Sequence, residues 1–386
     1  MNKRLLIALL ASAIAWPAVA QTTDPIYDRP FVAGTGTTAI GGYLEGNTNY
    51  VVEDGISEGF SMELRRFNIF LYSAIGSRIT FLSELEFEHG TEEIALETAL
   101  IDFRISPQMA LRAGILLPPL GTFNQNHDSP RWEFVDRPLV STRIIPSTLS
   151  EVGFGLHGRV PVGGIDAGYQ IYLVNGLGNG IVNNTEGRTD IPSGRDEEAF
   201  AEDNNGEPAV VGRIEARLPR WGTVGLAAYS GTYNTWRVEG DQVDDKRRVR
   251  LLTLDYAGSV GPVDLTGEAA MAWIDVPNGL SELFGDRQHG AFLDAVYPIH
   301  HGRVGAIQDA TVSVAVRVEY ADLNVGTFSG TGGRIGDEET AVALGLSFRP
   351  HAETVFKMNY RYHWKSDLLG NPIRLAGVQA GFATYF

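Results

Sequence analysis

The chain has 386 residues, a formal net charge of -16 from 31 Lys and Arg against 47 Asp and Glu, and no cysteine. The acidic balance argues against nucleic acid as a partner, because surfaces that bind nucleic acid are basic. Without cysteine, neither disulfide bonds nor thiolate metal ligands can stabilise the fold.

The first residues have the pattern of a secretory signal peptide. Lys3 and Arg4 form a positive start, residues 5–15 form an apolar segment, and residues 18–20 (AVA) form a small-x-small cleavage site. We expect residues 1–20 to be removed on export, which leaves residues 21–386 as one domain with a net charge of -16 - 2 = -18. The remaining sequence contains no run of about 20 apolar residues that could form a transmembrane helix.

Polar and apolar residues alternate with a period of two in most segments of the chain, which is typical of half-buried strands. In residues 354–364 (TVFKMNYRYHW), the apolar and aromatic residues fall on one face, and Lys357, Asn359, Arg361 and His363 fall on the other. About sixteen such segments can be counted. They lie near residues 36–49, 60–75, 78–89, 93–105, 108–117, 150–161, 164–175, 208–219, 222–233, 246–259, 262–275, 288–298, 310–323, 338–350, 353–365 and 374–386. In the fourth segment, Glu97 and Asp102 fall on opposite faces unless a β-bulge intervenes.

The connections between these segments alternate between short and long, as expected for a barrel with short periplasmic turns and long external loops. The last segment ends in GFATYF, and its terminal Phe386 is typical of the signal that the barrel assembly machinery reads. Pairing this segment with the first would close the barrel and leave no free edge. The sequence therefore predicts an all-β, transmembrane antiparallel β-barrel of about sixteen strands in the bacterial outer membrane.

Residues 116–149 are long, polar and rich in proline, and they follow neither a helical nor a strand period. A loop of this length inside a compact domain is usually functional. It is the third external loop by our count, and we expect it to fold into the lumen and narrow the pore. The loop carries His127, Asp128, Arg131, Glu133, Asp136, Arg137 and Arg143.

Polar faces should line the water-filled lumen of a sixteen-stranded barrel. Rings of basic residues at a constriction select for anions. The expected pore-lining and constriction residues are Arg112, Arg131, Arg137, Arg143, Arg159, Arg213, Arg317, Lys357 and Arg361. Two alternatives stay open: the lumen charges could simply neutralise one another, and Arg131 and Arg137 could pair with Glu133 and Asp136 to brace the loop.

Residues 108–160 resemble the phosphate-selective porin O/P family of Gram-negative bacteria. The matching pieces are residues 119–121 (PLG), 136–138 (DRP) and 151–155 (EVGFG). The resemblance implies a homotrimeric outer-membrane porin for the passive diffusion of small hydrophilic solutes, with some preference for anions such as phosphate.

Other functions receive less support from the sequence. A barrel enzyme would need a Ser/His pair, and neither His157 nor His363 has a serine at a spacing that suggests one. His300 and His301 point apart on an extended chain, so we expect no metal site, no catalytic residue and no cofactor. The acidic residues 195–207 could bind cations that bridge lipopolysaccharide, although such a run is more often a solvated loop. A non-conducting structural or adhesion barrel is a third possibility.

Overall fold

The structure is a computed structural model that describes residues 38–195 and 200–386. The expected signal peptide, residues 1–20, and residues 196–199 of the acidic segment lie outside the described residues. Within the described ranges, no helix is both long and apolar enough to cross a bilayer.

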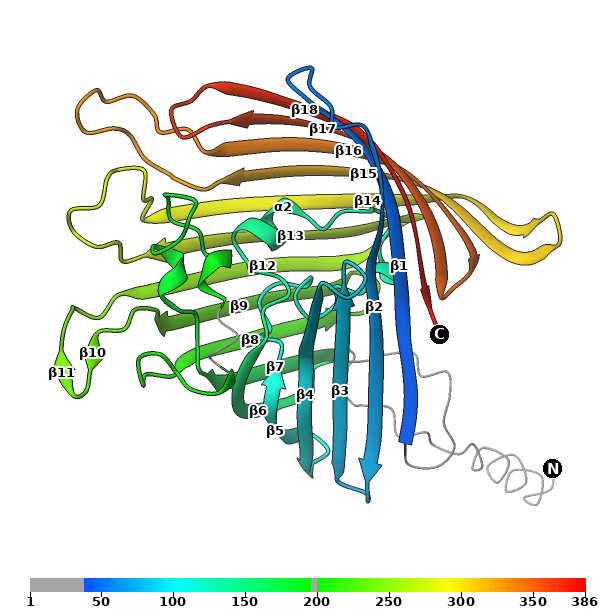
Figure 1. The fold of residues 1–386 in the computed structure, drawn as a ribbon. Coiled ribbons are helices and arrows are strands. Elements are labelled where there is room, and N and C mark those ends of the chain that lie inside the picture. The colour runs from blue at the N-terminus through cyan, green and yellow to red at the C-terminus, as the bar shows by residue number, and fades with distance from the viewer. Residues whose placement is uncertain (1–37, 196–199) are drawn as a thin grey trace.

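Sixteen strands of the described chain form one closed antiparallel barrel, in which β18 completes the ring by pairing with β1 (Figure 1). The barrel strands are β1 (Thr38–Glu53), β2 (Phe60–Ile75), β3 (Ile79–Glu88), β4 (Glu93–Ser106), β5 (Met109–Leu116), β6 (Glu151–Val162), β7 (Ile165–Val174), β8 (Ala209–Leu218), β9 (Gly222–Thr232), β12 (Arg248–Val260), β13 (Val263–Ile274), β14 (Arg287–Val304), β15 (Ile307–Asp322), β16 (Glu338–His351), β17 (Thr354–Ser366) and β18 (Pro372–Tyr385). The short strands β10 (Arg237–Val238) and β11 (Asp241–Gln242) form a separate hairpin between β9 and β12. The predicted all-β barrel of about sixteen strands is confirmed.

Alternation along each strand sends apolar side chains outward and polar side chains inward. On β17, Met358 and Tyr360 are 56% and 47% exposed, whereas Lys357 and Asn359 are buried. An outward band of exposed apolar side chains suits a barrel surrounded by lipid. The pattern that predicted the strands from sequence is therefore the pattern that separates the two faces of the barrel wall.

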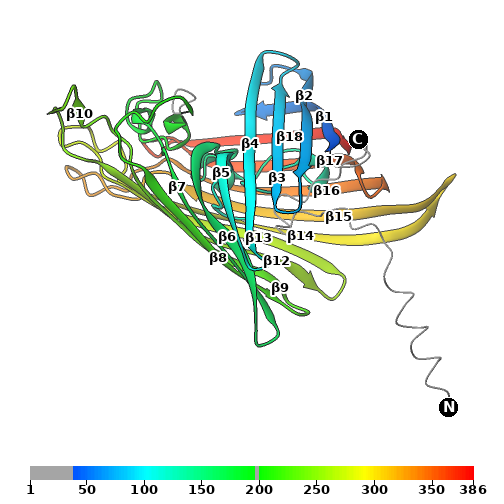
Figure 2. The ribbon, with the colours of Figure 1, turned by 90° about the horizontal axis from the view of Figure 1, so that it is seen from below.

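The hairpin of β14 and β15 is longer than the sequence predicted. We expected strands at 288–298 and 310–323 with a long connection, but β14 continues to Val304 and the turn is tight. Register shifts at Pro298/His300 and Gly302/Val304 break the period of two without ending the pairing. The hairpin extends past the neighbouring turns of the barrel (Figures 1 and 2).

Two β-bulges bring additional charged residues into the interior. Between β1 and β2, Glu45 pairs with Arg66 and Gly46 with Leu64, so Arg65 is the extra residue. Between β3 and β4, Glu84 pairs with Thr98 and Leu85 with Leu96, so Glu97 is the extra residue. A bulge lets two consecutive side chains share one face of a strand. The bulge that would place Glu97 and Asp102 on the same face is present.

Residues 117–150, here called the inner loop, connect β5 to β6 and lie inside the ring of strands (Figure 1). The loop contains the 3-10 turn η3 (Ser129–Arg131) and the short helix α2 (Leu139–Arg143). Its apolar residues Leu117, Leu120, Val140 and Ile144 are fully buried and belong to one cluster with inward residues of the wall. The inner loop therefore contributes a large share of the buried apolar residues inside the barrel.

The base of the inner loop is closed by Asn124. Its Nδ2 donates to the carbonyl oxygens of Pro118 and Leu149, at 2.8 and 3.2 Å, and its Oδ1 accepts from the Leu149 amide at 2.8 Å. The Asn124 side chain is fully buried. A single amide thus joins the two ends of the loop where they leave the wall.

Candidate functional site

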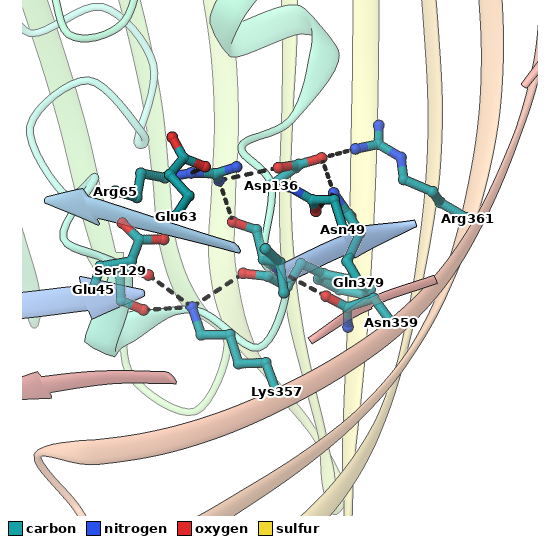
Figure 3. A network of polar contacts seen from close by, with 12 residues as sticks. Glu45, Asn49, Glu63, Arg65, Ser129, Asp136, Lys357, Asn359, Arg361 and Gln379 are labelled. Carbon is teal, nitrogen blue, oxygen red and sulfur yellow. Dashed lines mark hydrogen bonds and ion pairs between the residues drawn. The ribbon is translucent and has the colours of Figure 1, made fainter. Parts of the chain in front are cut away.

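The inner loop is attached to β16 and β17 by three polar side chains. Nζ of Lys357 donates to the Ser129 carbonyl at 2.7 Å, to Ser129 Oγ at 2.9 Å and to the Phe134 carbonyl at 3.0 Å (Figure 3). The Val135 amide donates to Oδ1 of Asn359 at 2.7 Å. Arg349 of β16 forms an ion pair with Glu133 at 2.6 Å. These contacts position residues 129–135 against the wall.

Asp136 connects the inner loop to three strands of the wall. Its Oδ1 accepts from Nη1 of Arg65 at 3.0 Å, and its Oδ2 accepts from Nε2 of Gln379 at 2.7 Å and forms an ion pair with Arg361 (Figure 3). The partners come from β2, β18 and β17, so one carboxylate connects three strands. Glu133 and Asp136 therefore bind arginines of the wall, and the alternative in which they brace Arg131 and Arg137 within the loop is wrong. Asp128 instead lies 4.0 Å from Arg131 within the loop.

The opposite side of the inner loop is held by acids of the wall. Glu268 of β13 accepts from the Thr122 amide at 2.7 Å and from Ser141 Oγ at 2.9 Å. Glu319 of β15 accepts from the Leu139 amide at 2.6 Å. Glu319 and Glu268 stand two and four strands from β17 in the ring. The loop also reaches the strand opposite β17, because Nε2 of Gln125 donates to Oε1 of Gln170 on β7 at 3.3 Å, so the loop spans the interior.

A cavity of about 540 Å³, here called the vestibule, lies between the inner loop and strands β1, β2, β16, β17 and β18. Its cations are Arg65, Arg66, Arg137, Arg143, Arg361 and Lys365, and its carboxylates are Glu63, Asp136 and Glu339. Six cations against three carboxylates leave an excess of positive charge on the lining. His89 and Lys365 place the cavity toward the barrel end that carries the long loops.

Arg137 and Arg143 supply most of this excess. Within the described residues neither guanidinium forms an ion pair within 4 Å, whereas Arg65 and Arg361 both pair with Asp136. Burial lowers the pKa of Arg137, and the nearby charge of Arg66 lowers it further. Arginine nevertheless stays protonated at neutral pH, so both guanidinium groups are available to an anion in the vestibule.

A second cavity, of about 230 Å³, lies on the other side of the loop. Its lining includes Gly121 and Gln125 of the inner loop, together with Arg217 and Thr223 next to a short turn between strands. Arg213 and Arg217 face Glu215 and Asp255 here, so the charges balance. The basic excess of the vestibule is therefore not shared by this second cavity.

The predicted constriction residues fall into two groups. Arg137, Arg143 and Arg361 line the vestibule. The others are held by partners of the wall or the loop. Arg112 pairs with Asp102 and Arg317 with Asp294, in each case through two bonds of 2.7 Å. Arg213 pairs with Asp255, and Arg159 pairs with Asp166 and Glu215. Lys357 binds loop carbonyls, and Arg131 donates to Tyr385 Oη at 3.0 Å. The role of all nine in solute passage stays a prediction.

Sequence reasoning missed three cations of the vestibule: Arg65, Arg66 and Lys365. Arg65 and Arg66 are adjacent, so simple alternation sends one of them outward, and only the bulge brings both inside. Lys365 follows the inward series of Lys357, Asn359, Arg361 and His363, and extending that series by two residues would have found it.

No family model matches the chain, so membership of the phosphate-selective porin O/P family stays a prediction. An uncharacterized protein of Aquifex aeolicus (strain VF5) is 27% identical over 363 residues, which cover 88% of this chain and 79% of that protein.

Solved structures of outer-membrane proteins superpose on most of the barrel. The anion-selective porin from Comamonas acidovorans matches with a TM-score of 0.58 at 13% identity, over 91% of this chain and 99% of that one. The outer-membrane channel DcaP of Acinetobacter baumannii matches with a TM-score of 0.56 at 12% identity, over 90% and 97%. OprB of Pseudomonas putida matches with a TM-score of 0.55 at 9% identity, over 91% and 94%. The chain has the fold of the outer-membrane porins.

Proposed function

We propose that the protein is an outer-membrane porin through which small hydrophilic solutes diffuse passively, with a preference for anions such as phosphate. The observation that carries the proposal is the vestibule, where six cations face three carboxylates beside a loop that spans the lumen. Basic linings at narrow points attract anions and repel cations. The solved anion-selective porin that shares the fold supports the same direction.

The acidic net charge of the chain does not oppose this preference. Charges more than roughly 8–10 Å from a permeating ion are largely screened at physiological salt. An ion next to the inner loop lies within a few ångströms of the vestibule side chains, so the local excess of cations decides the selectivity.

The test is the reversal potential of single channels in a potassium chloride gradient. We expect the wild type to prefer chloride and the double variant Arg137→Gln with Arg143→Gln to lose most of that preference. Arg250→Gln is the control for the loss of a positive charge outside the lumen, because its outward-facing side chain is 47% exposed. A wild type that prefers potassium, or a double variant with unchanged selectivity, would overturn the anion preference.

Conductance also separates a porin from the alternatives. A non-conducting structural or adhesion barrel would give no current steps, and a barrel hydrolase would cleave ester substrates. His157 Nε2 lies 3.3 Å from Asp102, and His363 is bonded to both Glu339 and Arg361. Both histidines considered as catalytic bases are therefore engaged by charged groups.

The assembly that we propose is a homotrimer in the outer membrane, inserted by the barrel assembly machinery after removal of residues 1–20. Its external loops would face lipopolysaccharide. Mass determination of the N-terminus of the exported protein and light scattering of the detergent-solubilised barrel would test the cleavage and the trimer.

A further inference from the structure

Three potential metal ligands meet where the inner loop contacts the wall behind the vestibule. Glu84 of β3, Glu97 of β4 and His127 of the loop are each no more than 3% exposed. One ligand atom from each lies within 4.8 Å of those from the other two. Only the bulge in β4 turns Glu97 inward, so the cluster depends on a local departure from regular pairing.

The His127 ring is oriented by the main chain of its own loop. Its Nδ1 lies 3.0 Å from the Asn124 carbonyl oxygen, which can only accept, so Nδ1 carries the proton. Nε2 then faces Oε1 of Glu97 at 3.2 Å. Imidazoles that bind metals commonly donate their other N–H to a carbonyl in this way.

The two carboxylates are also positioned. Nδ2 of Asn68 donates to Oε1 of Glu84 at 2.7 Å. Neither oxygen of Glu97 accepts a hydrogen bond of ordinary geometry, although the side chain is only 2% exposed. A buried carboxylate without hydrogen-bond donors lowers the stability of the folded chain unless a nearby cation compensates its charge. Glu84, Glu97 and a neutral imidazole carry a charge of -2, which a divalent cation would neutralise, and the carboxylate of Asp128 would add one further negative charge.

We propose that Glu84, Glu97 and His127 bind a divalent transition-metal ion, with Zn²⁺ the best fit. Imidazole nitrogen favours zinc and its neighbours over calcium and magnesium, which prefer an all-oxygen shell. Zinc ligands lie about 2.0–2.2 Å from the ion, so small side-chain rotations let atoms within 4.8 Å of one another converge on it. Asp128 Oδ1 lies 3.8 Å from the same His127 nitrogen and offers a fourth oxygen.

The ion would connect the inner loop to the wall at a point that the contacts of Lys357 and Glu268 do not reach. Metal binding would therefore stabilise the folded barrel and restrict the loop, and removing the metal would release residues next to Arg131. None of the proposed ligands is a cation of the vestibule, so zinc uptake can be measured whether or not the pore selects anions.

Metal binding can be measured on the full chain refolded in EDTA and then desalted. We expect calorimetry to show uptake of a single Zn²⁺ ion per chain. His127→Gln and Glu97→Gln should each lower the affinity by about tenfold or more, because even indirect supports of a metal site contribute 10–100-fold. His157→Gln is the matched control: it is a buried lumen histidine beside Asp102, away from the cluster. Unheated gel mobility confirms that each variant keeps a folded barrel.

A second measurement requires no variant. Electron spin-echo spectra of the Cu²⁺-loaded wild type should show a single coordinated imidazole. Absence of zinc uptake by the wild type, or equal uptake by His127→Gln, would overturn the site and leave a buried ion pair between protonated His127 and Glu97.

Discussion

The attachment of the inner loop to β17 can be tested at Lys357. The side chain is 5% exposed, and its ammonium group supplies three hydrogen bonds to the loop. Lys357→Met keeps the length and much of the volume of the side chain but leaves the carbonyls of Ser129 and Phe134 without their donor. Each buried carbonyl that loses its donor costs about 1–3 kcal/mol.

The loss is partly offset, because the variant no longer buries an ammonium group. We therefore expect Lys357→Met to lower the free energy of unfolding by about 2–4 kcal/mol, as measured by urea unfolding in detergent micelles. Residues 129–135 should also become more mobile, and single-channel recordings should show more current noise.

Lys365→Met is the matched control on the same face of the same strand. Lys365 is 28% exposed and lies 3.5 Å from Glu53, so its ion pair contributes about 0–1 kcal/mol. Since Lys365 lines the vestibule, this variant should weaken anion preference and keep its stability. Equal unfolding midpoints for the two variants would refute the view that Lys357 anchors the loop.

Three further predictions concern orientation and wall stability. Thr185→Cys should react with an impermeant maleimide on intact cells, and Gly163→Cys should not; labelling at Gly163 would reverse the proposed orientation. Tyr360→Arg should cost about 2–4 kcal/mol because the side chain faces lipid, whereas Tyr360→Phe should be neutral in the same unfolding assay. Arg112→Met leaves Asp102 without its bidentate partner and should cost about 3–5 kcal/mol; an unchanged unfolding midpoint would contradict this.

The number of strands, most of their limits and the lack of a strand or helix period in the inner loop were predictable from the sequence. Because the barrel wall has lipid on one side and a polar interior on the other, apolar and polar residues alternate along each strand, and this alternation is visible in the sequence. The inner loop was identified by the lack of that signal. Its inward position was expected from its length and from its place as the third external loop.

The charge arrangement was less predictable, because it depends on partners that are distant in sequence. Arg112 and Arg317 are inward-facing as predicted, but bidentate pairs with Asp102 and Asp294 occupy their guanidinium groups. The bulges at Arg65 and Glu97 redirect side chains against the period, and only the conflict at Glu97 was visible beforehand. His127 is 30 positions from Glu97 and 43 from Glu84 in the sequence, so no local spacing could reveal the cluster.

Asn124 has a consequence for how such a barrel can diversify. Because its amide joins Pro118 to Leu149, the loop is closed at its base, and this closure does not depend on the contacts made by the tip of the loop. The entropic cost of a closed loop grows only with the logarithm of its length. Closure by itself therefore sets little limit on the length of the segment between Asn124 and Leu149, whereas the contacts of that segment with Lys357, Glu268 and Glu319 limit its sequence. The charges that the loop presents to the vestibule can therefore change while Asn124 still closes the base of the loop.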